Sequence, residues 1–149
     1  MFQALHRDER HTIRLPFPID ACFPLFTPEG ERRWVPDWQP LYLHPPSGET
    51  TEGMVFTTGH GGETTLWCLI DLDEVNGRLR YSRLTPGSRS VIVHVRLDAL
   101  SENETELTVE YSYTGLSEHG NAAIEAATGP AFTAMIESWK AMILEKIAA

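Results

Sequence analysis

The sequence has little cysteine and no long apolar run, and each shortage excludes a class of protein. Only Cys22 and Cys68 are present among the 149 residues, so a disulfide framework is excluded and we expect two free thiols. No apolar stretch approaches the roughly 20 residues of a membrane-spanning helix, so we expect no membrane insertion. The first residues lack the long apolar core and small-residue site of a secretory signal, which predicts a cytoplasmic protein.

The chain has fewer positively charged than negatively charged residues. Lys and Arg number 12 against 21 Asp and Glu, which gives a formal net charge of -9. This excess of negative charge repels a phosphate backbone, and no run of basic residues forms a nucleic-acid footprint. We therefore exclude nucleic acid as the main partner.

Motifs for metals, nucleotides and catalytic nucleophiles are also missing. His60 and Glu63 border a glycine-rich turn, but no other His, Cys or Asp stands at a recognised ligand spacing. The same turn joins two predicted strands and leads into no helix with a following Lys, so it is not a phosphate loop. No serine has the Gly-x-Ser-x-Gly context of a nucleophile elbow. We expect no metal and no cofactor.

Alternating apolar and polar residues predict a sheet with one dry face. Residues 11–17, 91–97 and 107–113 show this period of two. Segments rich in β-branched and aromatic residues predict further strands, and Asn76-Gly77 and Pro86-Gly87 mark tight turns. These further strands cover residues 53–58, 64–72 and 79–84.

Helices are predicted at two places in the chain. After the first strand, Asp20 is expected to cap one short helix, and Thr27 followed by Pro28 to cap a second. A proline-rich segment, residues 35–47, then reads as an extended connection or edge strand. Near the C-terminus, apolar residues recur at steps of three or four and predict one long amphipathic helix, bent or broken near Gly129-Pro130. Its stripe is Ile124, Thr128, Phe132, Met135, Trp139 and Met142.

This order of elements predicts one α+β domain over residues 1–149. A curved antiparallel sheet of about six to seven strands wraps around the long C-terminal helix, and two short helices follow the first strand. A parallel βαβ arrangement is excluded, because no helical period separates consecutive strands between residues 53 and 113.

Several segments resemble the SRPBCC superfamily, whose START-like, birch-pollen-allergen-like domains share the helix-grip fold. The first of them is most similar to an uncharacterised group within the superfamily. The matching segments are residues 23–31 (FPLFTPEGE), 34–38 (WVPDW), 53–56 (GMVF), 65–67 (TLW) and 113–117 (YTGLS). The resemblance implies a ligand cavity between the sheet and the long helix. It leaves the activity open, because the superfamily includes lipid carriers, polyketide cyclases and activators of chaperone ATPases.

The residues supply a lining for such a cavity, although the same stripe would also fill a solid core. Trp34 and Trp38 are candidates for a gate at its mouth, or for an ordinary packing cluster. Arg83 and Asp71 are the polar side chains expected inside, whereas His94 and Glu110 fall on the wet face. The expected lining is Tyr81, Val93, Val95, Val109, Tyr111, Phe132, Met135 and Trp139.

Three functions remain open from the sequence. We favour binding or transport of a small, mostly hydrophobic molecule by a monomer or homodimer, because tyrosine and tryptophan combine an apolar body with a polar tip. The alternatives are a metal-independent cavity enzyme of the polyketide cyclase or dehydratase type, and a protein-interaction module. The charged residues Glu29, Glu31, Arg32 and Arg33 are expected to form a solvated helix face without a role.

Overall fold

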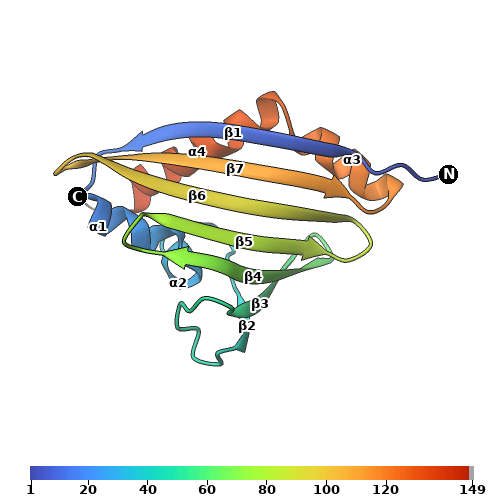
Figure 1. The fold of residues 1–149 in the computed structure, drawn as a ribbon, viewed down its shortest axis with the longest axis horizontal. Helices are drawn as coiled ribbons and strands as arrows, with labels where there is room; N and C mark the ends of the chain where they lie inside the picture. The colour runs from blue at the N-terminus through green and yellow to red at the C-terminus, as the bar shows by residue number, and fades with distance from the viewer. Residues whose placement is uncertain (148–149) are drawn as a thin grey trace.

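The computed structural model describes residues 1–147, which form one antiparallel sheet with helices on a single face. The strand order is β1-β7-β6-β5-β4-β3-β2, so consecutive strands from β2 to β7 are neighbours and β1 closes the row beside β7. In Figure 1, α3 and α4 run behind β1 and β7, and α1 and α2 lie near the far end of α4. The strands are β1 (His6–Leu15), β2 (Leu41–His44), β3 (Val55–His60), β4 (Glu63–Asp73), β5 (Arg78–Thr85), β6 (Arg89–Ser101) and β7 (Glu104–Gly115).

The alternation in the two longest strands places one face against the helices. The apolar residues of β6 and β7 that share a face are all buried, and the residues between them are not all covered. This confirms the predicted dry face. The buried set is Val91, Val93, Val95 and Leu97 in β6, with Leu107, Val109, Tyr111 and Tyr113 in β7.

The short helices between β1 and β2 each have a proline at or beside their first residue. They are α1 (Ile19–Cys22), a 3₁₀ helix η1 (Phe23–Phe26) and α2 (Pro28–Glu31). The Thr27 hydroxyl accepts a hydrogen bond from the Gly30 amide at 3.1 Å, as predicted for the cap of α2. The prediction for Asp20 is wrong: Pro18 occupies the cap position, so Asp20 lies inside the first turn, near the positive end of the helix dipole.

The C-terminal helical region is broken at the predicted place. Helix α3 (Glu118–Ala127) ends before Thr128, and α4 (Pro130–Lys146) begins at Pro130, with Gly129 at its N-cap. Gly129 has φ 70° and ψ -135°, a conformation open mainly to glycine, and its amide donates to the Glu9 carboxylate of β1. The break lets α4 turn away from α3 and pack chiefly against β1.

Restarting the helix at Pro130 also changes which side chains of α4 are covered. Phe132, Ile136 and Ile143 are buried, whereas Met135 and Trp139 of the predicted stripe are only half-buried. The most covered side of α4 is therefore rotated from the predicted stripe, because α3 and α4 do not share one continuous helical phase.

Cys22 and Cys68 are free thiols, and burial raises the pKa of the Cys22 thiol, which donates to the Phe17 carbonyl at 3.6 Å. Within residues 1–147, no helix has both the length and the apolar character needed to cross a bilayer.

The positive φ of Gly129 generates a stability prediction. Gly129→Ala should lower the free energy of unfolding by about 1–3 kcal/mol, because an alanine must adopt a backbone region that L-residues avoid. A Cβ at this position would meet no atom within 4 Å, so the loss reports the backbone and not a clash. Urea unfolding measures it.

Gly59→Ala is the matched control. Gly59 lies exposed in β3 with an ordinary φ, and an added Cβ there would be 3.8 Å from its nearest neighbour. We expect a change within about 0.5 kcal/mol of the parent protein. Equal losses for the two variants would contradict the role assigned to Gly129.

Candidate functional site

The concave face of the sheet is the face that lies against the helices. One row of cross-strand partners runs across this face and places a charged side chain on it. Trp67 of β4 pairs with Arg83 of β5, which pairs with Val91 of β6, and Val91 pairs with Tyr113 of β7. Cross-strand partners share a face, so Arg83 lies on the same side as the buried Val91 and Tyr113. The Arg83 guanidinium carbon lies 5.3 Å from the centre of the Trp67 ring. Its Nε is buried without a hydrogen-bond partner among residues 1–147.

The neighbouring row is aromatic and lies under α4. Tyr81 pairs with Val93, and Val93 pairs with Tyr111. The Tyr111 ring centre is 5.2 Å from that of Phe132 and 6.4 Å from that of Trp139, so α4 covers this row. The Tyr81 hydroxyl donates to the Phe26 carbonyl at 2.7 Å, which ties η1 to the sheet.

Helix α2 brings an acidic side chain to these two rows. Burial raises the pKa of Glu31 well above its ordinary value, and the nearby Arg83 acts in the opposite direction. Glu31 in turn raises the pKa of the buried Tyr81, after the larger effect of burial. Burial likewise raises the pKa of Tyr111 to about 12. Arg83, Glu31 and the tyrosines therefore share one electrostatic environment on the concave face, which we call the Arg83–Glu31 site.

The expectation that Glu31 belongs to a solvated helix face is wrong. Glu29 and Glu31 stand two residues apart in a four-residue helix, so their side chains point in different directions. Glu29 is exposed, accepts from Arg32 at 2.7 Å and also contacts the Tyr42 hydroxyl. Glu31 is half-buried and turns toward the sheet.

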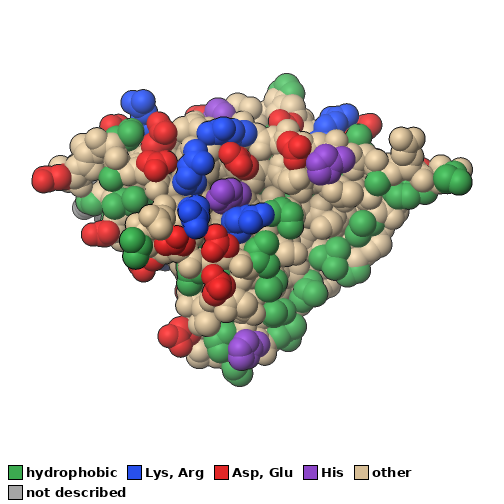
Figure 2. Space-filling model, in the orientation of Figure 1, with side chains coloured by type: hydrophobic (Ala, Val, Ile, Leu, Met, Phe, Trp, Pro, Cys, Tyr) green, Lys and Arg blue, Asp and Glu red, His purple; other side chains and the backbone are tan. Residues whose placement is uncertain are grey.

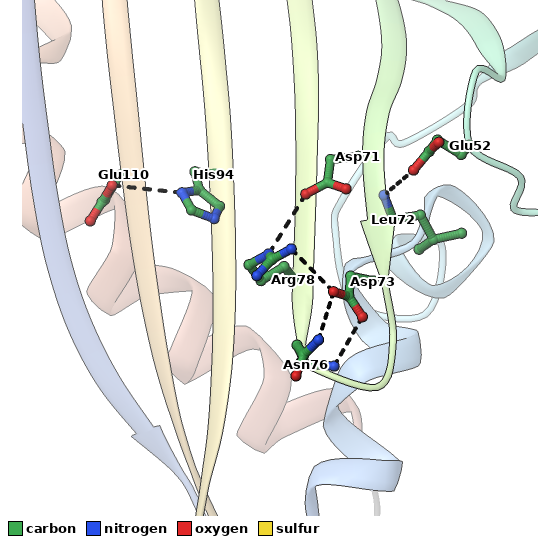
Figure 3. Close-up of polar contacts among 8 residues, drawn as sticks. All are labelled: Glu52, Asp71, Leu72, Asp73, Asn76, Arg78, His94 and Glu110. Carbon is green, nitrogen blue, oxygen red and sulfur yellow. Dashed lines mark hydrogen bonds and ion pairs between the residues drawn. The ribbon is translucent and has the colours of Figure 1, made fainter.

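Asp71 lies on the opposite face from the one expected. The register shifts between Leu69 and Asp71, so Asp71 pairs with Arg80 on the outer side of the sheet. A β-bulge adds one residue to a strand and so reverses the direction of the side chains that follow it. Figure 3 shows Asp71 directed at Arg78, with an O–N separation of 3.7 Å.

The expected lining residues belong to the concave face of the sheet or to α4. Six of them are buried, whereas Met135 and Trp139 are half-buried. Five hollows of the described residues lie elsewhere, and Tyr111 is the expected lining residue that borders one of these five. The six are Tyr81, Val93, Val95, Val109, Tyr111 and Phe132.

The two tryptophans expected at the mouth differ in burial. Trp34 is 2% exposed, with its ring between those of Phe26 and Trp139 at centre distances of 5.8 and 5.7 Å. Trp38 is half-buried and meets the Trp67 ring edge-on at 5.6 Å. Water reaches part of Trp38, Trp67 and Arg83, whereas Leu69, Leu79 and Tyr81 of β4 and β5 are buried, so the concave face meets water locally, beside Trp67 and Arg83, and is otherwise largely covered.

His60 and Glu63 take no part in this arrangement. Glu63 accepts from Arg89 at 3.3 Å and contacts the His119 ring nitrogen at 3.3 Å, which joins β4 to the start of α3. No group of three His, Cys, Asp or Glu within residues 1–147 is placed to hold a metal ion.

Sequence reasoning missed Glu31 and Trp67 as members of the site. Trp67 could have been found, because it lies two residues from each of the buried Thr65 and Leu69 in β4 and therefore shares their face. For Glu31 the only signal is its two-residue separation from Glu29 after Pro28, which becomes informative once α2 is known to be a single turn.

Solved structures share this fold over nearly the whole chain. No protein-family model matches the sequence, and no curated protein does. Norcoclaurine synthase from Thalictrum flavum, solved with dopamine and hydroxybenzaldehyde, is 10% identical with a TM-score of 0.68, over 98% of this chain and 91% of that one. The Zhui aromatase/cyclase from Streptomyces sp. R1128 is 16% identical with a TM-score of 0.69, over 97% and 98% of the two chains. A putative uncharacterized protein from Rhizobium leguminosarum is 14% identical with a TM-score of 0.69, over 96% and 97%.

These likenesses confirm the predicted fold class. The seven-stranded antiparallel sheet, the short helices after β1 and the long C-terminal helix are those of the predicted helix-grip fold. At identities of 10–16%, the likeness concerns the fold alone.

The raised pKa of Glu31 predicts a pH-dependent effect of Glu31→Gln. A raised folded-state pKa means that folding disfavours the carboxylate, a cost absent below the unfolded pKa and complete above the folded one. The variant should therefore gain stability relative to the parent protein as pH rises from about 4 to about 8. Urea unfolding at the two pH values measures the difference.

The loss of the Glu31 interaction with Arg83 does not change the direction of this result, because linkage depends only on the two pKa values of Glu31. Glu125→Gln, on the exposed side of α3, serves as control and should show no such trend. A Glu31→Gln difference that stayed constant or shrank with rising pH would show that the folded protein does not raise this pKa.

Proposed function

We propose that the protein binds a small, mostly apolar molecule on the concave face, with a polar group of the ligand at the Arg83–Glu31 site. The observation that carries the proposal is the buried Nε of Arg83, which has no hydrogen-bond partner among residues 1–147 on a face otherwise built from aromatic and aliphatic side chains. The eight residues expected to line the cavity are its proposed apolar contacts.

A guanidinium in such a place needs an acceptor. A buried donor without a partner costs about 1–3 kcal/mol, and more when it is charged. The Trp67 ring supplies a cation–π contact, which satisfies none of the guanidinium N–H groups. A ligand carbonyl, phenol or acid group would accept from this donor, and its apolar body would lie against Trp67, Tyr111 and Trp139.

The open part of the concave face favours entry over β4 and β5. Trp38, Trp67 and Arg83 are half-buried there, so a ligand can cover area that water now reaches. Trp38 is therefore the better candidate for the gate, and Trp34 serves as packing support behind Trp139. Among the similar folds, the norcoclaurine synthase structure holds two small aromatic molecules, which supports a ligand of this size.

The second candidate is a cavity enzyme of the cyclase or dehydratase type, favoured by one observation. Glu31 has a raised pKa and lies near both Arg83 and Tyr81. A carboxyl group that keeps its proton at higher pH than usual can donate it to a ligand and take it back, which is the work of a general acid and base. Catalysis would use the same site as binding, with Glu31 as the proton donor and Arg83 holding the developing negative charge.

Binding of 1-anilinonaphthalene-8-sulfonate tests the proposal, because this probe combines an aromatic body with an acidic group. Its addition should change tryptophan emission saturably, and Arg83→Met should weaken binding by about tenfold or more, through loss of a charge-assisted hydrogen bond. Arg33→Met is the matched control, because Arg33 is exposed in the turn after α2; the affinity of this variant should match that of the parent protein.

Trp139→Phe locates the probe within the fold. The phenyl ring keeps most of the apolar bulk, so the variant should retain binding while losing most of the change in tryptophan emission. Trp34→Phe should keep that change, because Trp34 lies behind Trp139 and is 2% exposed. An unaltered affinity in Arg83→Met, together with an unaltered signal in Trp139→Phe, would show that the probe does not bind on the concave face.

A further inference from the structure

The outer face of the sheet carries a row of charged side chains at its centre. Asp71, Arg80, His94, Glu110 and Arg10 are consecutive partners across β4, β5, β6, β7 and β1. Figure 2 shows this face, with basic side chains gathered around a histidine over the middle strands. The row lies on the side opposite the helices and is separate from the Arg83–Glu31 site.

A hollow of about 360 Å³ lies along this row. Arg80, His94 and Arg10 line it, together with Ile92 and Ser112 from the next row of the sheet. Its wall thus combines cationic groups with an apolar floor. This volume falls within the lower range of small-molecule sites.

The acidic side chains beside the hollow already have partners. Glu110 lies 3.5 Å from Arg10 and 3.7 Å from His94 Nδ1. Asp8, at the other border, accepts from the Ser112 hydroxyl at 2.7 Å. The Arg10 guanidinium offsets part of the charge of Glu110, whereas the neutral Ser112 hydroxyl does not offset that of Asp8, and Glu9 also borders the hollow.

Two groups of the hollow remain without a partner among the described residues. Arg80 is exposed and makes no ion pair within residues 1–147, whereas Arg78 of the same strand lies 3.7 Å from Asp71 and 3.1 Å from Asp73. His94 Nε2 is buried with no hydrogen-bond partner there. Figure 3 shows the second nitrogen of the His94 ring turned away from Glu110 and toward β5, the strand that carries Arg80.

Arg80 and His94 are direct cross-strand partners. Like charges directly opposite one another destabilise a sheet, so this pair opposes protonation of the imidazole. Burial first, and then Arg80, Arg96 and Arg78, lower the pKa of His94, while Glu110 acts in the opposite direction. An anionic hydrogen-bond acceptor placed between Arg80 and His94 would remove the repulsion between the guanidinium and a protonated imidazole.

We propose that the outer-face hollow binds a small organic carboxylate, held by Arg80 and His94 and resting on Ile92. The guanidinium fork of Arg80 matches the two oxygens of a carboxylate. Glu110 and Asp8 border the hollow and would repel a second negative charge, which favours a singly charged carboxylate over a phosphate dianion. The apolar floor favours an aromatic or branched body on the ligand.

Binding is coupled to the protonation of His94. An anion beside the imidazole favours its charged form and raises its pKa, so affinity should increase as pH falls through that value, until the ligand itself becomes protonated. The charged groups facing His94 are Glu110 from β7, Arg78 and Arg80 from β5 and Arg96 from its own strand. An anion that neutralises the nearby Arg charges would add to the effect of Glu110 and raise the pKa of His94.

The test titrates the full chain with sodium benzoate and follows the His94 ring by two-dimensional NMR. Benzoate should shift the His94 signals saturably and raise the pKa of His94, and Arg80→Gln should weaken this response by about tenfold or more. Arg14→Gln is the matched control, because Arg14 is also exposed on the outer face of β1 but pairs with Glu106 outside the hollow. It should leave affinity within about twofold of the parent protein.

Three outcomes would overturn the inference: no saturable shift at His94, equal weakening by Arg80→Gln and Arg14→Gln, or tighter binding of inorganic phosphate than of benzoate. The Arg83→Met variant separates this inference from the proposed function. Loss of the His94 response in Arg83→Met, with retention in Arg80→Gln, would place the carboxylate on the concave face and would leave the proposed function standing.

Discussion

A sheet with one apolar face must have that face covered by other elements, and the rest of this structure depends on this requirement. The strands present a continuous layer of apolar side chains on one side, and leaving it in water would cost roughly 25 cal/mol for each Å² of apolar surface. The helices available are three single-turn pieces after β1 and two longer ones after β7. Gly129 and Pro130 divide the latter, so α3 lies at the end of β7 and α4 packs along β1.

The helices cover the concave face incompletely, and the candidate site lies at the edge of the covered part. Helix α4 packs chiefly against β1 and meets Tyr111 of β7 through Phe132 and Trp139, while the rings of Trp38 and Trp67 remain partly in contact with water. The charged residues of this face, Arg83 and Glu31, lie near that boundary. Arg83 makes no ion pair within residues 1–147 and its Nε has no hydrogen-bond partner there, so we propose that a ligand, and not a contact within the fold, is its partner.

The outer face of the sheet carries rows of charged side chains. Along its rows of paired residues, Asp71–Arg80 and Glu110–Arg10 are opposite in sign and Arg78–Arg96 are alike, and several charges have an ion-pair partner, as Arg78 has with Asp71 and Asp73. Exposed pairs of this kind contribute little to stability, so their arrangement is free to serve binding. Arg80 makes no ion pair and His94 Nε2 has no hydrogen-bond partner within residues 1–147, which sets their hollow apart.

The sequence by itself determined which features are local. Alternation assigned the buried residues of β6 and β7, Thr27 and Pro28 set the start of α2, and Gly129-Pro130 set the break before α4, because each depends on residues within one turn or one strand. Only the tertiary structure decided the faces of Asp71 and Glu31. One bulged residue after Leu69 reverses Asp71, and the docking of a single-turn helix on distant strands aims Glu31 at Arg83. Both depend on contacts between segments far apart in the chain, which a pattern of neighbouring residues does not encode.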